Sequence, residues 1–172
     1  LNCRFVKNFI VQTNLMRDLL IKNYPVQSSK VYVIPNPVPV WLIKCKIKRV
    51  SKKYFRHNKL KLFYPASFYP HKNHMLLSNA KNHDSIPIQN LFLTIDNSVN
   101  PASCVRWISC VGHLDSESML YYYSQVDALI FMSKEESYGF PLLEAMYIGL
   151  PIVCADLPYA HELCGGVAIY FN

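Results

Sequence analysis

Two glutamates lie eight residues apart around a Gly-Phe-Pro turn in residues 133–156, SKEESYGFPLLEAMYIGLPIVCAD. Pro141 suits the first position of a helix, where its missing N–H has no partner to lose. We expect the amides of residues 139–142 to point outward from this helix N-terminus, which favours anions. Glu136 and Glu144 would then hold hydroxyl groups on either side. Taken alone, each glutamate also fits a solvated loop or a favourable helix-dipole position, but together they favour a phosphorylated polyol.

A second candidate loop, FYPASFYPHKNH at residues 63–74, contains a lysine. Lys72 is expected at the head of a helix, where a lysine can reach a diphosphate as a compact point charge. His71 and His74 flank it with the spacing of a zinc pair, but the sequence offers no nearby third ligand. Asn73 is expected to cap the helix. The aromatic residues of this loop are interpreted as packing residues: Tyr64, Phe68 and Tyr69.

Two further loops carry weaker signals. Gly112 follows an expected strand and would let a flat ring approach the backbone, with His113 lining a base pocket, although a surface turn fits equally. His161 and Glu162 are assigned ordinary turn and helix-cap roles. The chain contains no G-x-G-x-x-G, no G-x-x-x-x-G-K-[ST] and no G-x-S-x-G motif, nor a D-x-D metal clamp.

These loops need a scaffold, and the hydrophobic pattern predicts strands alternating with single helices. Strands are expected over 9–13, 31–34, a segment ending at 64, 88–95, 105–112, 126–133, 151–156 and 165–171. Helices are expected over 14–24, 73–81, 118–124 and 141–149, and residues 96–106 are expected to be irregular. Asn14 is the expected N-cap of the first helix, Asp115 or Ser116 caps the third, and Gly149 ends the fourth.

Such alternation predicts an open parallel α/β sheet with right-handed crossovers. Ligands in these sheets bind beyond the carboxyl ends of the strands. The loops in which we expect a site are therefore 64–73, 96–101, 112–116, 133–141 and 155–161.

The composition is that of a globular protein, with 172 residues, 51% hydrophobic and 17% charged. It allows one full domain plus a fragment of another. We find no apolar run of membrane-spanning length and no cleavable signal at the start, and the missing initiator Met suggests a fragment. The six irregularly spaced cysteines are expected to be free thiols in a reducing cytosol.

The positive charge is concentrated in residues 44–61, which hold nine of the 18 Lys and Arg and no acidic residue. A solvated linker is the favoured interpretation, and contact with an anionic membrane surface is the alternative. No nucleic-acid motif accompanies the run, so we expect no nucleic-acid partner.

The stretch Glu136-Ser-Tyr-Gly-Phe-Pro-Leu-Leu-Glu144-Ala-Met, followed by Gly149-Leu-Pro and Ala155-Asp156, resembles the E-x7-E signature of retaining GT-B glycosyltransferases of family 4, the "glycosyl transferases group 1". The resemblance implies a GT-B type fold, a Rossmann-like open parallel sheet with helices on both faces. It also implies three parts: residues 1–40 ending the N-terminal acceptor-side domain, a basic linker at 41–60, and a C-terminal donor domain at 61–172 that lacks its terminal helices.

The resemblance also implies roles for individual residues. Glu136 would contact hydroxyls of the donor sugar, Glu144 would accept from the ribose, and Lys72 would neutralise the leaving nucleoside diphosphate, so that Glu136 and Lys72 are the catalytic candidates. The family commonly carries an Arg where this chain has Ser67. The other donor-binding candidates are Ser67, Gly112, His113, Ser137, Tyr138, Gly139, Phe140, Pro141 and Leu142.

The implied activity is a retaining, metal-independent transfer from a nucleoside-diphosphate sugar to a glycan or a lipid-linked acceptor, without a cofactor, in the synthesis of surface polysaccharide. The implied location is cytoplasmic, with residues 44–61 able to contact the inner face of the membrane. Two alternatives remain open, a nucleotide-sugar epimerase on the same architecture and an inactive nucleotide-sugar-binding or interaction module.

Overall fold

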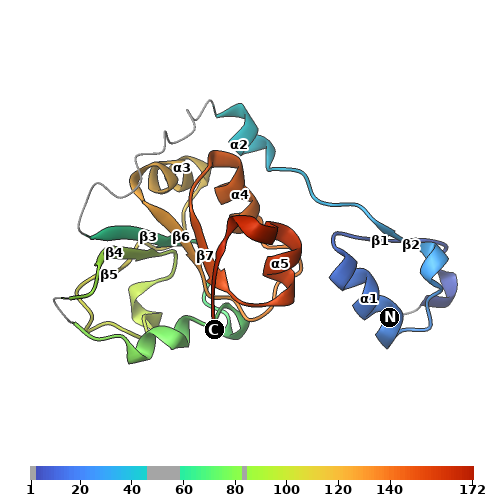
Figure 1. The fold of residues 1–172 in the computed structure, drawn as a ribbon, viewed down its shortest axis with the longest axis horizontal. Coiled ribbons are helices and arrows are strands. Elements are labelled where there is room, and N and C mark those ends of the chain that lie inside the picture. Colours follow the sequence, from blue (N-terminus) through green and yellow to red (C-terminus); the bar gives the residue numbers. More distant parts are fainter. Residues whose placement is uncertain (1–2, 46–58, 83–84) are drawn as a thin grey trace.

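A six-stranded parallel sheet organises the protein, in the order β5-β4-β3-β6-β7-β8 (Figure 1). The computed structural model describes residues 3–45, 59–82 and 85–172. The open α/β fold predicted from the sequence is confirmed. Because β3 and β6 are neighbours while the chain runs outward from each of them, the strand order reverses between these two. The strands are β3 (Leu60–Tyr64), β4 (Ile88–Leu93), β5 (Ile108–Cys110), β6 (Ala128–Phe131), β7 (Ile152–Ala155) and β8 (Ile169–Phe171).

Helices cover both faces of this sheet. Successive residues of a strand point to opposite faces, and in β3 the ring of Phe63 contacts Tyr122 and Tyr123 whereas that of Tyr64 contacts His74. The α-helices are α1 (Asn14–Asn23), α2 (Val40–Lys44), α3 (Ser116–Gln125), α4 (Phe140–Ile148) and α5 (Pro158–Cys164). The 3-10 segments are η1 (Cys3–Phe5), η2 (Ser28–Lys30), η3 (Pro70–Lys72), η4 (His74–Asn79), η5 (Asn97–Val99) and η6 (Gly165–Val167).

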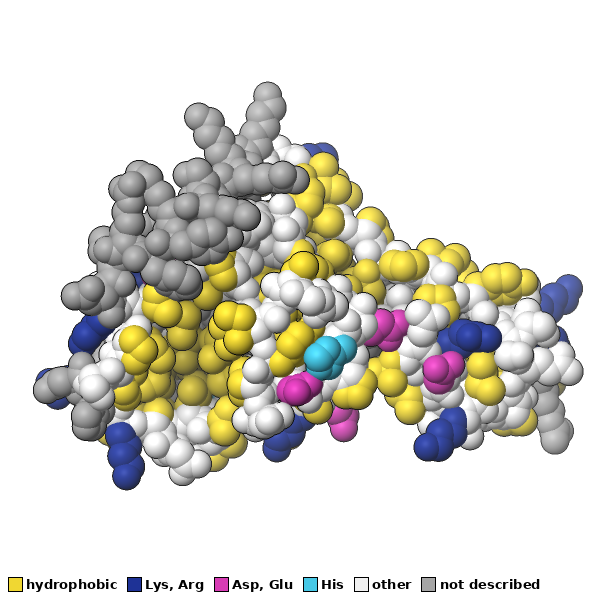
Figure 2. Space-filling model, in the orientation of Figure 1, with side chains coloured by type: hydrophobic (Ala, Val, Ile, Leu, Met, Phe, Trp, Pro, Cys, Tyr) yellow, Lys and Arg dark blue, Asp and Glu magenta, His cyan; other side chains and the backbone are white. Residues whose placement is uncertain are grey.

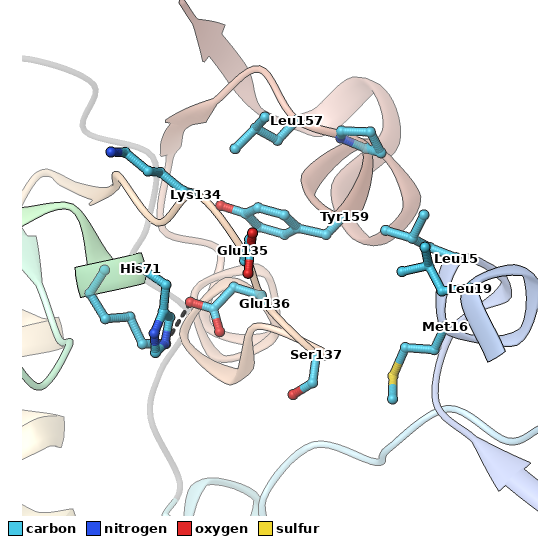
Figure 3. A pocket seen from close by; sticks show the side chains of 12 residues that line it. Leu15, Met16, Leu19, His71, Lys134, Glu135, Glu136, Ser137, Leu157 and Tyr159 are labelled. Carbon is cyan, nitrogen blue, oxygen red and sulfur yellow. Dashed lines mark hydrogen bonds and ion pairs between the residues drawn. The ribbon is translucent and has the colours of Figure 1, made fainter. Parts of the chain in front are cut away.

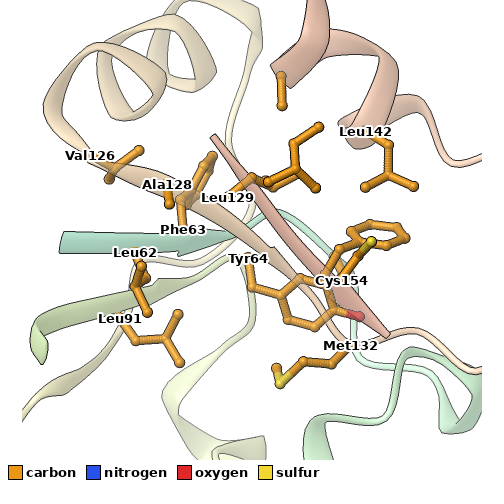
Figure 4. Packing of buried hydrophobic residues seen from close by; sticks show 14 of the residues in the cluster. Leu62, Phe63, Tyr64, Leu91, Val126, Ala128, Leu129, Met132, Leu142 and Cys154 are labelled. Carbon is orange, nitrogen blue, oxygen red and sulfur yellow. The ribbon is translucent and has the colours of Figure 1, made fainter. Parts of the chain in front are cut away.

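The core lies on the central strands (Figure 4). Phe63, Tyr64, Leu129 and Phe131 are completely buried, because parallel strands covered on both faces carry near-continuous apolar runs. Leu142 of α4 packs against the same cluster. On the face drawn in Figure 2, apolar side chains cover much of the surface, and Lys and Arg lie mostly at its margins.

The N-terminal residues form a separate unit in which β1 (Phe9–Val11) pairs in parallel with β2 (Val31–Val33) and α1 connects them. The predicted N-cap of α1 was wrong by one residue, because the Thr13 side chain, not that of Asn14, accepts from the Met16 amide. The domain bounds 1–40, 41–60 and 61–172 stay a prediction.

The basic run predicted as a linker lies mostly outside the described residues. The structure shows the two ends of this region, where α2 ends at Lys44 and β3 begins at Leu60, and Leu42 of α2 is completely buried in the core. Within the described ranges, no helix has the length and apolar character that crossing a bilayer requires, and no disulfide joins the cysteines there.

Two helical predictions were wrong. In place of the helix expected over 73–81 the structure has the 3-10 segment η4, and Asn73, which separates it from η3, adopts the left-handed conformation with a φ of 58°. Asn73 makes no side-chain cap bond either. Residues assigned to a turn after β7 instead form α5, which begins at Pro158, in agreement with the preference of proline for the first helical turn.

Candidate functional site

An ion pair lies beyond the carboxyl ends of the two strands at which the sheet order reverses. Lys72 follows β3 and Glu136 follows β6, and the Lys72 Nζ donates to the Glu136 Oε1 at 2.6 Å. The two side chains are 19% and 9% exposed. The structure therefore brings the two predicted catalytic residues together, at the place where parallel α/β sheets bind ligands.

Two tyrosines fix the loops that carry this pair. The Tyr64 hydroxyl donates to the Lys72 carbonyl at 2.6 Å and lies 2.9 Å from the Ser133 Oγ. The Tyr159 hydroxyl of α5 donates to the Ser133 carbonyl at 2.6 Å. Burial raises the pKa of both hydroxyls, which therefore stay protonated and able to donate. Because the Lys134 amide also donates to the His71 carbonyl at 2.7 Å, the two loops are joined directly.

The ion pair lines a cavity of about 670 Å³. Glu136 and Ser137 project into it, and Leu15, Met16 and Leu19 of α1 approach from the opposite side (Figure 3). One wall is thus charged and polar and the other is apolar. The lining residues are Leu15, Met16, Leu19, His71, Lys72, Lys134, Glu135, Glu136, Ser137, Leu157, Pro158 and Tyr159.

Glu144 belongs to a second pocket, of about 290 Å³. The expectation that it lies on an exposed turn was wrong, because its side chain is buried and accepts from the Tyr123 hydroxyl at 2.6 Å. Burial raises the pKa of Glu144, and the Tyr123 hydrogen bond opposes that rise. Two more predicted residues, Ser67 and His113, line this pocket. The full lining is Trp41, Pro65, Ser67, Thr94, His113, Leu114, Asp115, Ser116, Met119 and Glu144.

The turn between the two glutamates has the predicted glycine and proline, but fewer free amides than expected. Gly139 is left-handed, with a φ of 88°, and Pro141 lies in the first turn of α4. Leu142 was wrongly counted as an outward donor, because its amide donates to the Gly139 carbonyl at 2.9 Å and its side chain is buried. The amides of Gly139 and Phe140 donate to no acceptor within the described part of the chain.

Three more residues singled out in the sequence lie in different parts of the structure: Tyr138, Gly112 and Asp115. The Tyr138 side chain is buried and its hydroxyl donates to the Asn36 carbonyl at 2.9 Å, so it joins the N-terminal unit to the turn. Gly112 is left-handed at φ 72° but lines neither pocket. Asp115 caps α3 as predicted, accepting from the Ser118 amide.

The two histidines beside Lys72 lie in different environments. His74 is buried against Tyr64 and Phe68, and burial lowers its pKa to about 4. His71 lines the first cavity and stacks on Tyr69. Among the described residues no group of three or more His, Cys, Asp and Glu side chains is arranged to hold a metal ion.

Sequence reasoning missed the residues that position the site. Tyr64 was interpreted only as a packing residue, and Tyr123 lies in the helix expected over 118–124 without an assigned role. Both rings pack in the core, but the Tyr64 hydroxyl also holds the Lys72 loop and the Tyr123 hydroxyl holds Glu144. A buried tyrosine usually finds a partner for its hydroxyl, and that rule is the signal that was available.

The model of the family described as "Glycosyl transferases group 1" matches residues 107–165. These residues are similar to members of that family. The matched range holds both glutamates, the turn between them, α3 and α4, and it ends in the first residue of η6. The predicted resemblance to the glycosyl transferases group 1 is confirmed, and the retaining mechanism stays a prediction.

Two kinds of comparison, one with curated sequences and one with solved structures, agree with this similarity. The chain is 25% identical to the O-antigen chain mannosyltransferase RfbU of Salmonella typhimurium, over 96% of the chain and 47% of that protein, so it spans about half the length of this relative. The solved structure of Anabaena HepE in complex with UDP and glucose superposes with a TM-score of 0.67 at 15% identity, over 98% of this chain and 50% of that one. The lipopolysaccharide outer core galactosyltransferase WaaB superposes with 0.66 at 15% identity, over 97% and 49%.

Proposed function

We propose that the protein is a glycosyltransferase and that residues 59–172 bind its nucleoside-diphosphate sugar donor. The observation that carries the proposal is the Lys72–Glu136 pair at the strand-order reversal, with the Glu144 pocket nearby. Similarity to the family and to RfbU, a mannosyltransferase of O-antigen chains, supports transfer of a sugar in polysaccharide synthesis.

The donor extends across the α4 turn. Its nucleoside lies in the 290 Å³ pocket, where the ribose hydroxyls donate to Glu144 beside His113 and Ser67. Its diphosphate passes the free amides of Gly139 and Phe140 at the positive end of α4. Its sugar lies in the 670 Å³ cavity, where a hydroxyl donates to Glu136.

Lys72 supplies the charge that the reaction needs. As the bond between sugar and diphosphate breaks, negative charge grows on the leaving diphosphate, and a fixed ammonium group stabilises it. In the free protein Glu136 compensates this charge at 2.6 Å, so the donor exchanges one anionic partner of Lys72 for another. Since the sequence lacks a D-x-D clamp, we propose that this lysine acts without a metal ion. The resemblance of the E-x7-E stretch to retaining enzymes supports the further proposal that the transfer retains the anomeric configuration.

The acceptor approaches through the side of the cavity opposite Glu136, where Leu15, Met16 and Leu19 form an apolar wall. This wall suits an acceptor with an apolar part, and a lipid-linked glycan is the proposed class. We further propose that residues 44–61 bring the enzyme to an anionic membrane surface. Vesicle co-sedimentation that stays unchanged after their lysines and arginines are neutralised contradicts the membrane proposal alone.

Calorimetric titration with UDP, GDP and ADP tests donor binding. One of them is expected to bind, and Glu144→Ala to weaken it about tenfold, since a ribose hydrogen bond to a charged group is lost. Glu117→Ala is the control, because Glu117 lies in the exposed first turn of α3 outside both pockets. No binding of any of the three at millimolar concentration refutes the proposal.

A second experiment tests the chemistry in the full-length enzyme. Glu136→Ala and Lys72→Ala should lower turnover by about 100-fold or more, the effect of removing one preorganised charge from a transition state. Turnover in EDTA and the anomeric configuration of the product by NMR test metal independence and retention. Unchanged turnover in both variants shows that the catalytic residues are elsewhere.

A further inference from the structure

The helix that forms the apolar wall of the larger cavity is held at its N-terminus by a residue from the other end of the chain. The Asn14 amide donates to the Oε1 of Glu162 at 2.5 Å, and the Leu15 amide donates to its Oε2 at 2.9 Å. The next amide, that of Met16, is taken by the Thr13 side chain. The first three amides of α1 are therefore all satisfied, two of them by one carboxylate on α5.

This contact differs from an ordinary cap, in which the acceptor comes from the neighbouring residues. Amides at the start of a helix lack intrahelical partners, and they carry the positive end of the helix dipole. A carboxylate that uses both oxygens there fixes the direction of the helix as well as its position. Glu162 lies within α5, which also supplies Pro158 and Tyr159 to the cavity.

The contact lies at the start of the helix that forms one wall of the cavity. Leu15, Met16 and Leu19 on α1 face Glu136 and Ser137 across the space seen in Figure 3. The amides that Glu162 holds belong to this same first turn. If the carboxylate releases them, water satisfies the amides, and the wall is free to move away from the ion pair.

We infer that Glu162 is a positioning residue for sugar transfer, a latch that holds the acceptor-side wall against the donor site. The inference rests on the proposed function, because it takes the larger cavity as the place of transfer. Glu162 touches no part of the donor pocket around Glu144, so the latch acts on acceptor use and turnover and leaves nucleotide affinity unchanged.

Two independent variants break the latch from its two sides. Glu162→Ala removes both acceptors. Asn14→Pro removes one donor at the first helical position, where proline is tolerated, and Thr13 before it has the extended conformation that proline requires, with φ −138° and ψ 158°. Asn14→Ala is its matched control, because it keeps the amide and changes the side chain, and Glu117→Ala controls for the loss of a surface carboxylate.

Amide hydrogen exchange of the full-length protein reads the contact without reference to activity. We expect Glu162→Ala to speed exchange of the Leu15 and Asn14 amides about fivefold or more, in keeping with the loss of a charge-assisted hydrogen bond, and the two controls to leave it unchanged. Exchange that is the same in the variant and the wild type overturns the inference.

Steady-state kinetics test the positioning role of Glu162. Glu162→Ala and Asn14→Pro should each raise the KM for the acceptor or lower kcat by about fivefold. Their nucleotide affinity should stay within about twofold of the wild type. The variant that combines both substitutions should lose no more activity than Glu162→Ala alone. Faster exchange without a kinetic effect, or a parallel loss of nucleotide affinity, overturns the positioning role. Failure of the wild-type protein to bind any nucleotide refutes the proposed function instead. The result of the exchange experiment is unaffected by that failure, because amide exchange does not depend on nucleotide binding.

Discussion

Removal of the Tyr123 hydroxyl tests how the smaller pocket keeps a carboxylate buried. In the wild type this hydroxyl donates to Glu144 at 2.6 Å, and both side chains are buried. Tyr123→Phe keeps the ring and its edge contact with Phe63, whose centroid is 5.4 Å away. The substitution therefore removes a single hydrogen bond and leaves a buried acceptor without it.

The stability lost in Tyr123→Phe depends on pH because Glu144 titrates. A hydrogen bond to a charged group contributes about 1.5–3 kcal/mol, and one to a neutral group about 1 kcal/mol. We expect the free energy of unfolding to fall by about 2 kcal/mol where Glu144 is ionised, at the higher pH, and by about 1 kcal/mol where it is protonated, at the lower pH. The direction follows from the pKa of Glu144, which burial raises and the Tyr123 hydroxyl lowers part of the way back.

The free energy of unfolding changes with pH in the same direction in the wild type and in Tyr123→Phe. A carboxyl group whose folded pKa is raised binds its proton more tightly when folded, so its contribution to stability is present below the unfolded value of 4.5 and is lost as the pH rises through the folded pKa. Without the hydroxyl, the folded pKa of Glu144 rises further. The loss of stability with rising pH is therefore larger in Tyr123→Phe than in the wild type.

Urea unfolding at pH 4 and pH 7 measures the effect, with Tyr122→Phe as the matched control. Tyr122 is the neighbouring tyrosine, stacks on the same Phe63 ring at 5.5 Å and bonds its hydroxyl to no group within the described residues. It should change stability by less than about 0.5 kcal/mol. Equal losses in the two variants, or a loss in Tyr123→Phe that does not grow between pH 4 and pH 7, refute the reasoning.

Three further substitutions have defined outcomes. Gly139→Ala should cost about 1–2 kcal/mol in urea unfolding, because its φ is 88° and the new Cβ would lie 3.2 Å from Leu142, whereas Gly166→Ala, with no atom within 4 Å, should not. His74→Phe should remove the loss of stability between about pH 6.5 and 4, where the unfolded chain binds a proton that the folded side chain, with its pKa of about 4, resists. Ser67→Arg should tighten nucleotide binding in calorimetry by adding a cation at the smaller pocket, and unchanged affinity would show that Ser67 does not face the phosphates.

The sequence was sufficient for features that depend on local patterns. The runs around Phe63 and Leu129 are buried strands because each is apolar, short and bounded by turn residues. Gly149 ends α4, because a left-handed residue at a helix C-terminus favours glycine. Alternation of strands and helices then predicts a parallel sheet, and with it the edge at which Lys72 and Glu136 lie.

Features that depend on distant partners could not be predicted in the same way. Nothing near Glu162 in the sequence indicates that it caps a helix that begins 148 residues earlier. Asn73 is a good helix cap by type, but it also tolerates the left-handed conformation, and the Tyr64 bond to the Lys72 carbonyl fixes the loop just before it. The burial of Glu144 depends likewise on a tyrosine 21 residues away.

The spacing of the two glutamates acquires a physical reason in the fold. Glu136 precedes the left-handed Gly139, and Glu144 lies about 6 Å along α4 from Phe140, at a rise of about 1.5 Å per residue. The helix end thus separates their side chains into two pockets, with the free amides of Gly139 and Phe140 between them. A ligand with hydroxyl groups at its two ends and negative charge in the middle would satisfy both carboxylates and both amides. A nucleoside-diphosphate sugar, the proposed donor, has this arrangement.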